Sequence, residues 1–252
     1  QSLLLKKDNF ALIFGTYSIV LVLILLRFMD EIKDFEKDKI AHPERPLPRG
    51  LITLPEMHTA IRYLMLALYA FSAGMVISGT VAAGALLAIT TSYAWLMYKE
   101  FYVGAALADF PMIYAITHQV IIFPLYAMPL ALASPEMIVD QRFVLYLAYA
   151  LGSSMTFEIC RKLDPNAAPL LKTYLSIYGR DKTVAIILGC LIFSALAAYR
   201  AEMNFLIGFD ICVALSLLLV YLKPEKFKII EGVAVLSSLV HIWALAIAGF
   251  IA

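Results

Sequence analysis

The chain carries little charge for its length. Only 15% of its 252 residues are charged, whereas 62% are apolar and the mean hydropathy is +0.84. A soluble domain usually carries about 25% charged and about 45–50% apolar residues. This deficit excludes an ordinary soluble protein and indicates a chain that crosses a membrane several times.

Cysteine is also scarce. Cys160, Cys190 and Cys212 lie in or beside apolar runs, and no CxxC pair occurs. Thiols in such places usually act as small buried hydrophobic groups. We therefore expect neither a redox centre nor a thiolate metal site.

Long apolar runs dominate the chain instead. A helix that crosses a bilayer needs about 20 mostly apolar residues. We expect eight such helices, at 10–29, 57–77, 79–98, 108–133, 142–160, 183–200, 203–222 and 231–252. Pro111, Pro124 and Pro129 predict that the fourth is kinked or begins as a surface segment. The predicted fold is an all-α, polytopic transmembrane helical bundle that forms a single domain over residues 1–252.

Basic residues gather on one side of the predicted spans. That side receives segments 27–56, 99–107, 160–182 and 222–230. The opposite side holds only Lys6, Lys7, Arg142 and Arg200. By the positive-inside rule the basic side is cytoplasmic. We therefore expect an integral membrane protein whose charged clusters face the cytoplasm.

The most informative of these clusters is a set of three aspartates, which we call the aspartate row. Asp30, Asp34 and Asp38 recur every four residues directly after an apolar run, so a helix would align them. Carboxylates at the mouth of a membrane helix repel one another unless cations neutralise them. Mg²⁺ prefers oxygen ligands and commonly bridges carboxylates to phosphates. The competing interpretation is a charged loop whose acids pair with Lys33 and Lys37 along the helix.

A proline-rich segment follows the aspartate row. Pro43, Pro46 and Pro48 should stop the helix and stiffen the return of the chain. The return would bring Arg45 and Arg49 near the carboxylates. Guanidinium groups bind phosphate oxygens in a forked geometry, so the segment predicts a diphosphate clamp.

A second charged cluster closes the fifth predicted span. Glu158, Arg161 and Lys162 share one helix face, and Asp164 stands before a proline. One interpretation gives Glu158 and Asp164 a second metal, and the two basic residues the diphosphate oxygens. The alternative is a basic belt at the membrane interface with pairing inside the helix.

Two weaker candidates lie on the same side. Lys99 and Tyr98, at the end of the third span, would contact phosphate or belong to an interfacial aromatic belt. Tyr174, in a later loop, would cap the site.

Five ionisable residues lie alone within the predicted spans. Such groups are costly in a membrane and usually face a cavity or a partner. They are Asp109, His118, Asp210, Glu231 and His241. Asp210 is the costliest by position, and a functional role and an interhelical hydrogen bond are both open for it.

The aspartate row and the tail Arg45-Pro46-Leu47-Pro48-Arg49-Gly50 together resemble the UbiA superfamily of intramembrane prenyltransferases. Those enzymes carry NxxxDxxxD after the second of nine spans, and this tail follows it. They carry a second acidic motif, DxxxD, after the sixth. Here Asp30 replaces the usual asparagine, the family's first span is not seen, and Glu158-x2-Arg161-Lys162-x-Asp164 stands at the second motif. The arrangement looks like a bacterial branch of the family.

The resemblance implies a fold, a chemistry and a site. The fold would be a UbiA-type bundle with a central cavity and a cytoplasmic cap, in the inner membrane. Mg²⁺ would be held by Asp30, Asp34, Asp38, Glu158 and Asp164. The diphosphate of a polyprenyl donor would be bound by Arg45, Arg49, Lys99, Arg161, Lys162, Tyr98 and Tyr174. The prenyl group would pass to an aromatic or hydroxyl acceptor, and we expect no nucleic-acid partner.

Three other functions compete with this one. A terpene cyclase on the same scaffold would ionise the same donor but need no acceptor. A CDP-alcohol phosphotransferase uses an Asp-Gly dipeptide, which this chain lacks. A transporter would place its charges near the middle of the membrane, whereas here they lie mainly at one face, with Asp210 as the main exception.

Overall fold

The computed structural model describes residues 2–107, 110–133, 135, 138, 140–167 and 171–244, with side chains from residue 13 onward. This described part of the chain is helical and holds no strand. The main helices are α1 (Ser2–Ala41), α2 (Leu54–Ile77), α3 (Val81–Tyr98), α5 (Pro111–Gln119), α6 (Ile122–Ala133), α7 (Gln141–Cys160), α9 (Arg180–Arg200), α10 (Phe205–Ser216) and α12 (Phe227–Ile242). Shorter helices are η1 (Glu100–Tyr102), α4 (Gly104–Leu107), α8 (Tyr174–Tyr178), α11 (Leu219–Leu222) and η4 (Pro224–Lys226). The prediction of an all-α membrane protein is confirmed at this level.

Seven segments in the described residues are long and apolar enough to cross a membrane. They are Ile13–Lys33, Leu54–Ile77, Val81–Tyr98, Pro111–Leu132, Gln141–Cys160, Arg180–Arg200 and Phe205–Leu222. Each corresponds to one of the first seven predicted spans. The eighth, 231–252, coincides with α12 in its first half, and residues 245–252 lie outside the described residues.

The fourth predicted span is interrupted, as its prolines predicted. Helix α5 ends at Gln119, and α6 begins at Ile122 after a two-residue break. Pro124 lies in the first turn of α6, where its missing N–H costs nothing, while Pro129 lies inside the helix. Pro124 has no N–H to donate to the Val120 carbonyl, which accepts instead from the Phe123 N–H at 3.1 Å. This tighter turn explains why α5 and α6 do not form one continuous helix.

The chain divides into two compact units. Unit 1 comprises Gln1–Phe110 and Val120–Val139, and unit 2 comprises Pro111–Gln119 and Asp140–Ala252. The break in the fourth span therefore coincides with one of the three points at which the chain passes between the units.

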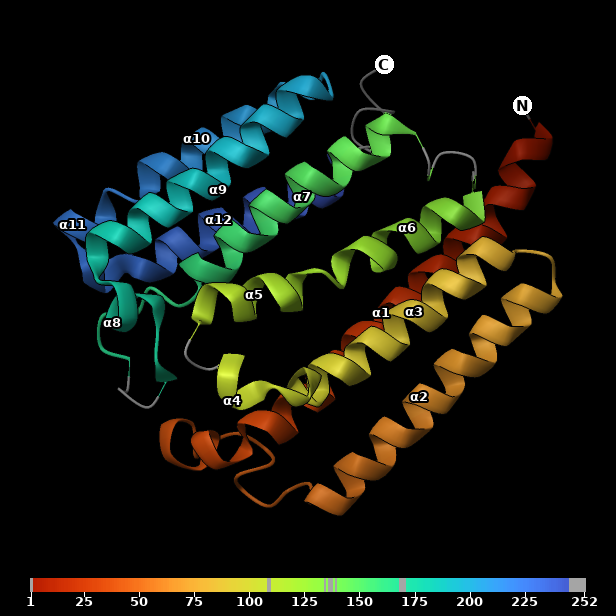
Figure 1. Cartoon of the computed structure of the whole chain (residues 1–252), viewed down its shortest axis with the longest axis horizontal. Coiled ribbons are helices and arrows are strands. Elements are labelled where there is room, and N and C mark those ends of the chain that lie inside the picture. The colour runs from red at the N-terminus through yellow and green to blue at the C-terminus, as the bar shows by residue number, and fades with distance from the viewer. Residues whose placement is uncertain are drawn as a thin grey trace. The chain divides into compact units, whose positions relative to one another are not determined.

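Unit 1 is built from α1, α2, α3 and α6, which pack side by side (Figure 1). Helix α2 begins at a capping box, in which the Thr53 hydroxyl accepts from the Glu56 N–H and the Glu56 carboxylate accepts from the Thr53 N–H. Helices α2 and α3 approach closely where Gly84 faces α2, and the Ser72 hydroxyl donates to the Gly84 carbonyl at 2.7 Å. Small residues at such contacts are typical of membrane helices.

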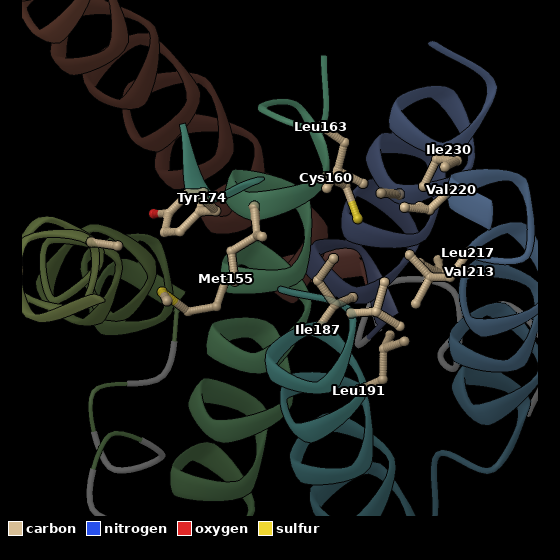
Figure 2. Packing of buried hydrophobic residues seen from close by; sticks show 14 residues of the cluster. Met155, Cys160, Leu163, Tyr174, Ile187, Leu191, Val213, Leu217, Val220 and Ile230 are labelled. Atoms are coloured by element: carbon tan, nitrogen blue, oxygen red, sulfur yellow. The ribbon is translucent and has the colours of Figure 1, made fainter. Parts of the chain in front are cut away.

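Unit 2 is built around α7, which packs against α9 and α12, while α10 packs against α9 and α12. Helices α7 and α9 approach closely at Gly152, where a Cβ would lie 2.9 Å from the Cys190 carbonyl oxygen. The apolar core of this unit gathers side chains from α7, α9, α10, α11 and α12, among them Ile187, Val213 and Ile230 (Figure 2). This core fixes the end of α7 that carries the second charged cluster.

Candidate functional site

The aspartate row lies on the last part of α1, as predicted, but its three members differ in exposure. Asp30 is exposed, Asp34 is half-buried and Asp38 is 3% exposed. Four residues turn a helix by about 400°, so each step rotates the row by about 40°. The row therefore turns gradually from solvent toward the protein.

Asp38 accepts a charged hydrogen bond from Arg45. The Arg45 Nη1 lies 2.5 Å from the Asp38 Oδ2. Helix α1 ends at Ala41, before the three prolines, and the His42 N–H still donates to the Asp38 carbonyl at 2.8 Å. Within this return of the chain, the Leu47 side chain is buried and anchors the segment to the protein interior. The predicted approach of Arg45 to the carboxylates is thus present in unit 1.

Arg49 is exposed at the end of the same return. Its N–H donates to the Arg45 carbonyl at 3.1 Å, and the Leu51 N–H donates to the Pro46 carbonyl at 3.0 Å. Gly50, with φ of 73°, adopts the left-handed conformation that glycine tolerates best. The backbone of the return is therefore ordered by its own hydrogen bonds, and Arg49 stays at the surface.

The end of α3 is tied to α1 by Lys33, which the sequence offered only as a helical partner of the row's carboxylates. Lys33 is largely buried, and its Nζ lies 3.4 Å from the Met97 carbonyl and 3.6 Å from Glu100 Oε1. The contacts of Lys33 with Met97 and Glu100 were not predicted, because they join residues more than 60 positions apart in the chain. These contacts place the segment after α3 beside the helix that carries the carboxylates.

The segment after α3 has an unusual backbone. Glu100, Phe101 and Tyr102 all have positive φ, between 49° and 59°. Such a run of non-glycine residues costs conformational energy at each position. It turns the chain sharply after Lys99, whose ammonium lies 4.7 Å from the centre of the Tyr98 ring and 4.8 Å from that of Trp95. Lys99 is exposed and rests on these aromatic faces.

The second cluster lies at the end of α7 in unit 2, and its charges pair with one another. Glu158 Oε2 accepts from Arg161 Nε at 2.6 Å, and Oε1 lies 2.5 Å from Lys162 Nζ. Both carboxylate oxygens are therefore engaged within the helix. This matches the alternative of intrahelical pairing that the sequence left open.

The two remaining predicted residues of unit 2 have structural partners. Asp164 accepts from the Asn166 N–H at 2.9 Å, which closes the turn after α7. Tyr174 begins α8, is buried, and lies with its ring centre 5.5 Å from Lys162 Nζ. Burial raises the pKa of the Tyr174 phenol above its usual range, and the nearby negative charge of Glu158 adds to the rise.

The carboxylates differ in how well they suit Mg²⁺. Within the described residues, no group of three or more histidine, cysteine, aspartate or glutamate side chains is placed to hold a metal. Mg²⁺ often needs only one or two carboxylates, because substrate phosphates and water complete its shell. Asp34 Oδ1 lies 3.7 Å from Lys37 Nζ, which matches part of the helical pairing that the sequence left open. Asp30 and Asp34 lie one turn apart and remain accessible to solvent, so they fit the requirement for Mg²⁺ better. Glu158, with both oxygens paired to cations, does not fit it.

Comparisons with known proteins give no relative: no family model, no curated protein and no solved structure matches this chain. The function must therefore be argued from the residues and their geometry.

Proposed function

We propose that this chain is an intramembrane prenyltransferase of the UbiA type, which ionises an allylic polyprenyl diphosphate and transfers the prenyl group to an acceptor. The observation that carries the proposal is the return of Arg45 onto the aspartate row at the end of a membrane helix. An acidic surface and a guanidinium side by side provide oxygen ligands for a divalent cation and donors for phosphate oxygens.

The carboxylates of the row have different roles in this proposal. Asp30 and Asp34 would hold Mg²⁺, which would neutralise charge on the diphosphate when bound. Asp38 is mostly buried and fixes the orientation of Arg45. Because the Asp38 contact uses one end of the guanidinium, further N–H donors of Arg45 remain for phosphate oxygens. Asp38 therefore acts as a positioning residue.

Basic residues around the row would complete the diphosphate site. Lys99 is exposed beside Tyr98, and the Lys33 contact brings this end of α3 to α1. Negative charge grows on the diphosphate as the allylic C–O bond breaks, so fixed cations stabilise the transition state more than the ground state. Lys99 and Arg45 would supply this stabilisation. Arg49, which is exposed at the end of the return, would make the first contact with the diphosphate.

The second cluster has a narrower role in the proposal than the family resemblance implies. Glu158 holds Arg161 and Lys162 in place, so these two residues present positive charge without a metal. Participation of this cluster in the same diphosphate site stays a prediction.

The first test is diphosphate release by the purified full chain in lipid nanodiscs. We expect release from geranylgeranyl diphosphate with Mg²⁺ and none after chelation. Isopentenyl diphosphate is the matched control, because it has the same head group but its C–O bond is not allylic. Equal release from both substrates, or release unaffected by chelation, would contradict the proposal.

Product analysis then separates the transferase from the cyclase. A transferase yields a prenylated acceptor when membrane lipid and quinone precursors are supplied. A cyclase yields a cyclic hydrocarbon or alcohol from the donor alone. A cyclic product would mean that the chain ionises the donor but does not transfer the prenyl group to an acceptor.

A further inference from the structure

Two ionisable side chains meet in the interior of unit 2. Asp210 lies on α10 and is 3% exposed, and His241 lies on α12 and is fully buried. The Asp210 Oδ1 is 3.4 Å from the His241 Nε2. The sequence singled out both residues but did not pair them, because nothing in the order of the chain shows that α10 and α12 place them at the same level.

The other imidazole nitrogen favours one form of the ring. The His241 Nδ1 lies 2.8 Å from the backbone carbonyl oxygen of Ser237. The Ser237 hydroxyl oxygen is 3.5 Å from Nδ1, farther than the Ser237 carbonyl oxygen, so the carbonyl is the better partner. A carbonyl oxygen only accepts, so this contact is a hydrogen bond only when Nδ1 carries the hydrogen. A neutral imidazole has a single N–H, and the Nε2 would then turn a lone pair toward the carboxylate.

A lone pair facing an ionised carboxylate is repulsive, most of all in a low-dielectric interior. One added proton, on either Nε2 or the carboxylate, makes the contact attractive. It also removes the net negative charge that the pair would otherwise bury, and an unbalanced buried charge is strongly unfavourable. We propose that Asp210 and His241 form a proton-binding site that holds one proton more than a carboxylate and a neutral imidazole hold separately.

The polar atoms of the site have no other donor in the described structure. Both Asp210 oxygens and the His241 Nε2 are buried without a hydrogen bond of normal geometry. From α7, the Tyr149 ring lies edge-on to the imidazole at 6.0 Å, and its buried hydroxyl is also unpaired. Tyr146, one turn earlier, donates instead to the Ile242 carbonyl at 3.2 Å.

In the described residues of the helices that pack around the pair, the charged side chains lie toward the helix ends. On α7 they are Arg142 and Glu158, seven residues before and nine residues after Tyr149. On α9, the helix that also packs on α10, the charged residues lie only at the ends, namely Arg180, Asp181, Lys182 and Arg200. On α12 the nearest charged residue is Glu231, ten residues before His241 and so about 15 Å along the helix. The proton, rather than a third side chain, balances the carboxylate.

The site is distinct from the second charged cluster of the same unit. Tyr149 precedes Glu158 on α7 by nine residues, which is about 13 Å of helix. Ionisable groups in the interior of membrane bundles are typical of proton sites. Here the bound proton would keep α10 attached to α12, so the packing of unit 2 would depend on its retention.

Nitrogen NMR on the ¹⁵N-histidine-labelled full chain in nanodiscs tests the proposal directly. The chain has only four histidines, and His241→Gln assigns the signal. We expect a protonated Nδ1, with either a protonated Nε2 or a protonated Asp210. Infrared difference spectra against Asp210→Asn separate these two forms by the carboxylic acid C=O band. An unprotonated Nδ1, or an unprotonated Nε2 with an ionised Asp210, would overturn the proposal.

Thermal unfolding of two variants gives a second, independent measurement. Asp210→Asn offers an amide N–H to Nε2 and needs no extra proton, so its midpoint should change by less than about 3 °C. His241→Phe leaves the carboxylate alone in the interior and should lower the midpoint by roughly 5–10 °C. An equal fall in the unfolding midpoint for both variants, or a larger fall for Asp210→Asn, would count against a proton-linked pair.

Discussion

At the residue scale, the three carboxylates of the aspartate row are equivalent in sequence and different in space. The four-residue spacing predicted a row on one helix, and the prolines predicted a return that brings Arg45 near it; both features are present. The sequence did not predict which of the three carboxylates pairs with Arg45. The pairing depends on how far the row rotates toward the protein and where the buried Leu47 anchors the return.

The Asp38–Arg45 pair gives the first prediction. Asp38→Asn leaves the guanidinium of Arg45 without its counter-charge and should lower the free energy of unfolding by about 1–3 kcal/mol. It should also weaken diphosphate binding, because Arg45 is no longer held in one orientation. Chemical unfolding and donor titration measure the two effects.

The control for this pair is a double-mutant cycle with Arg45→Ala. If the two residues act as a unit, the double variant should be little worse than Arg45→Ala alone. Additive losses in stability and in binding would show that Asp38 does not act through Arg45.

At the element scale, the sequence located the helices well and their ends less well. The second span begins at Leu54 rather than 57, because the Thr53–Glu56 capping box and Pro55 start the helix there. The break in the fourth span was foreseen from its prolines. The left-handed backbone of Glu100–Tyr102 was not foreseen, because none of these residues is a glycine or an asparagine. The contact of Lys33 with Glu100, which helps to hold this backbone, joins residues far apart in the chain.

Close packing of α7 on α9 gives the second prediction. A Cβ on Gly152 would meet backbone atoms of α9 at 2.9–3.0 Å, so Gly152→Ala must push the helices apart and should destabilise unit 2 by about 1–3 kcal/mol. Gly189→Ala on α9 is the matched control, because a Cβ there has no atom within 4 Å. It should leave stability unchanged or raise it slightly. Thermal unfolding compares the stabilities of the two variants. An equal change in the unfolding midpoint would argue against close packing of α7 on α9 at Gly152.

At the scale of the whole molecule, charge counting and apolar runs predicted a membrane protein, and the seven described spans agree. The division into two units could not be predicted in the same way. It depends on which helices pack together after the chain breaks at residues 120–121, and that information lies in many weak contacts rather than in one motif.

Orientation in the membrane gives the third prediction. Glu44 lies in the return after the aspartate row, and Ser78 lies at the opposite end of α2. In a background with the three cysteines replaced by serine, a membrane-impermeant maleimide should label Ser78→Cys in intact cells. It should label Glu44→Cys only after lysis. The reverse pattern would place the aspartate row outside and remove the cytoplasmic site.

The central claim, that the aspartate row is a diphosphate site, is tested most directly by comparing two variants of the same helix. Asp34 is half-buried on the row, whereas Glu36 is 79% exposed on another face, and each pairs with a lysine three residues later. Asp34→Asn should reduce Mg²⁺-dependent diphosphate release from geranylgeranyl diphosphate by on the order of 100-fold or more, while Glu36→Gln should release it at close to the wild-type rate. Equal rates in both variants, with both proteins folded, would contradict the account.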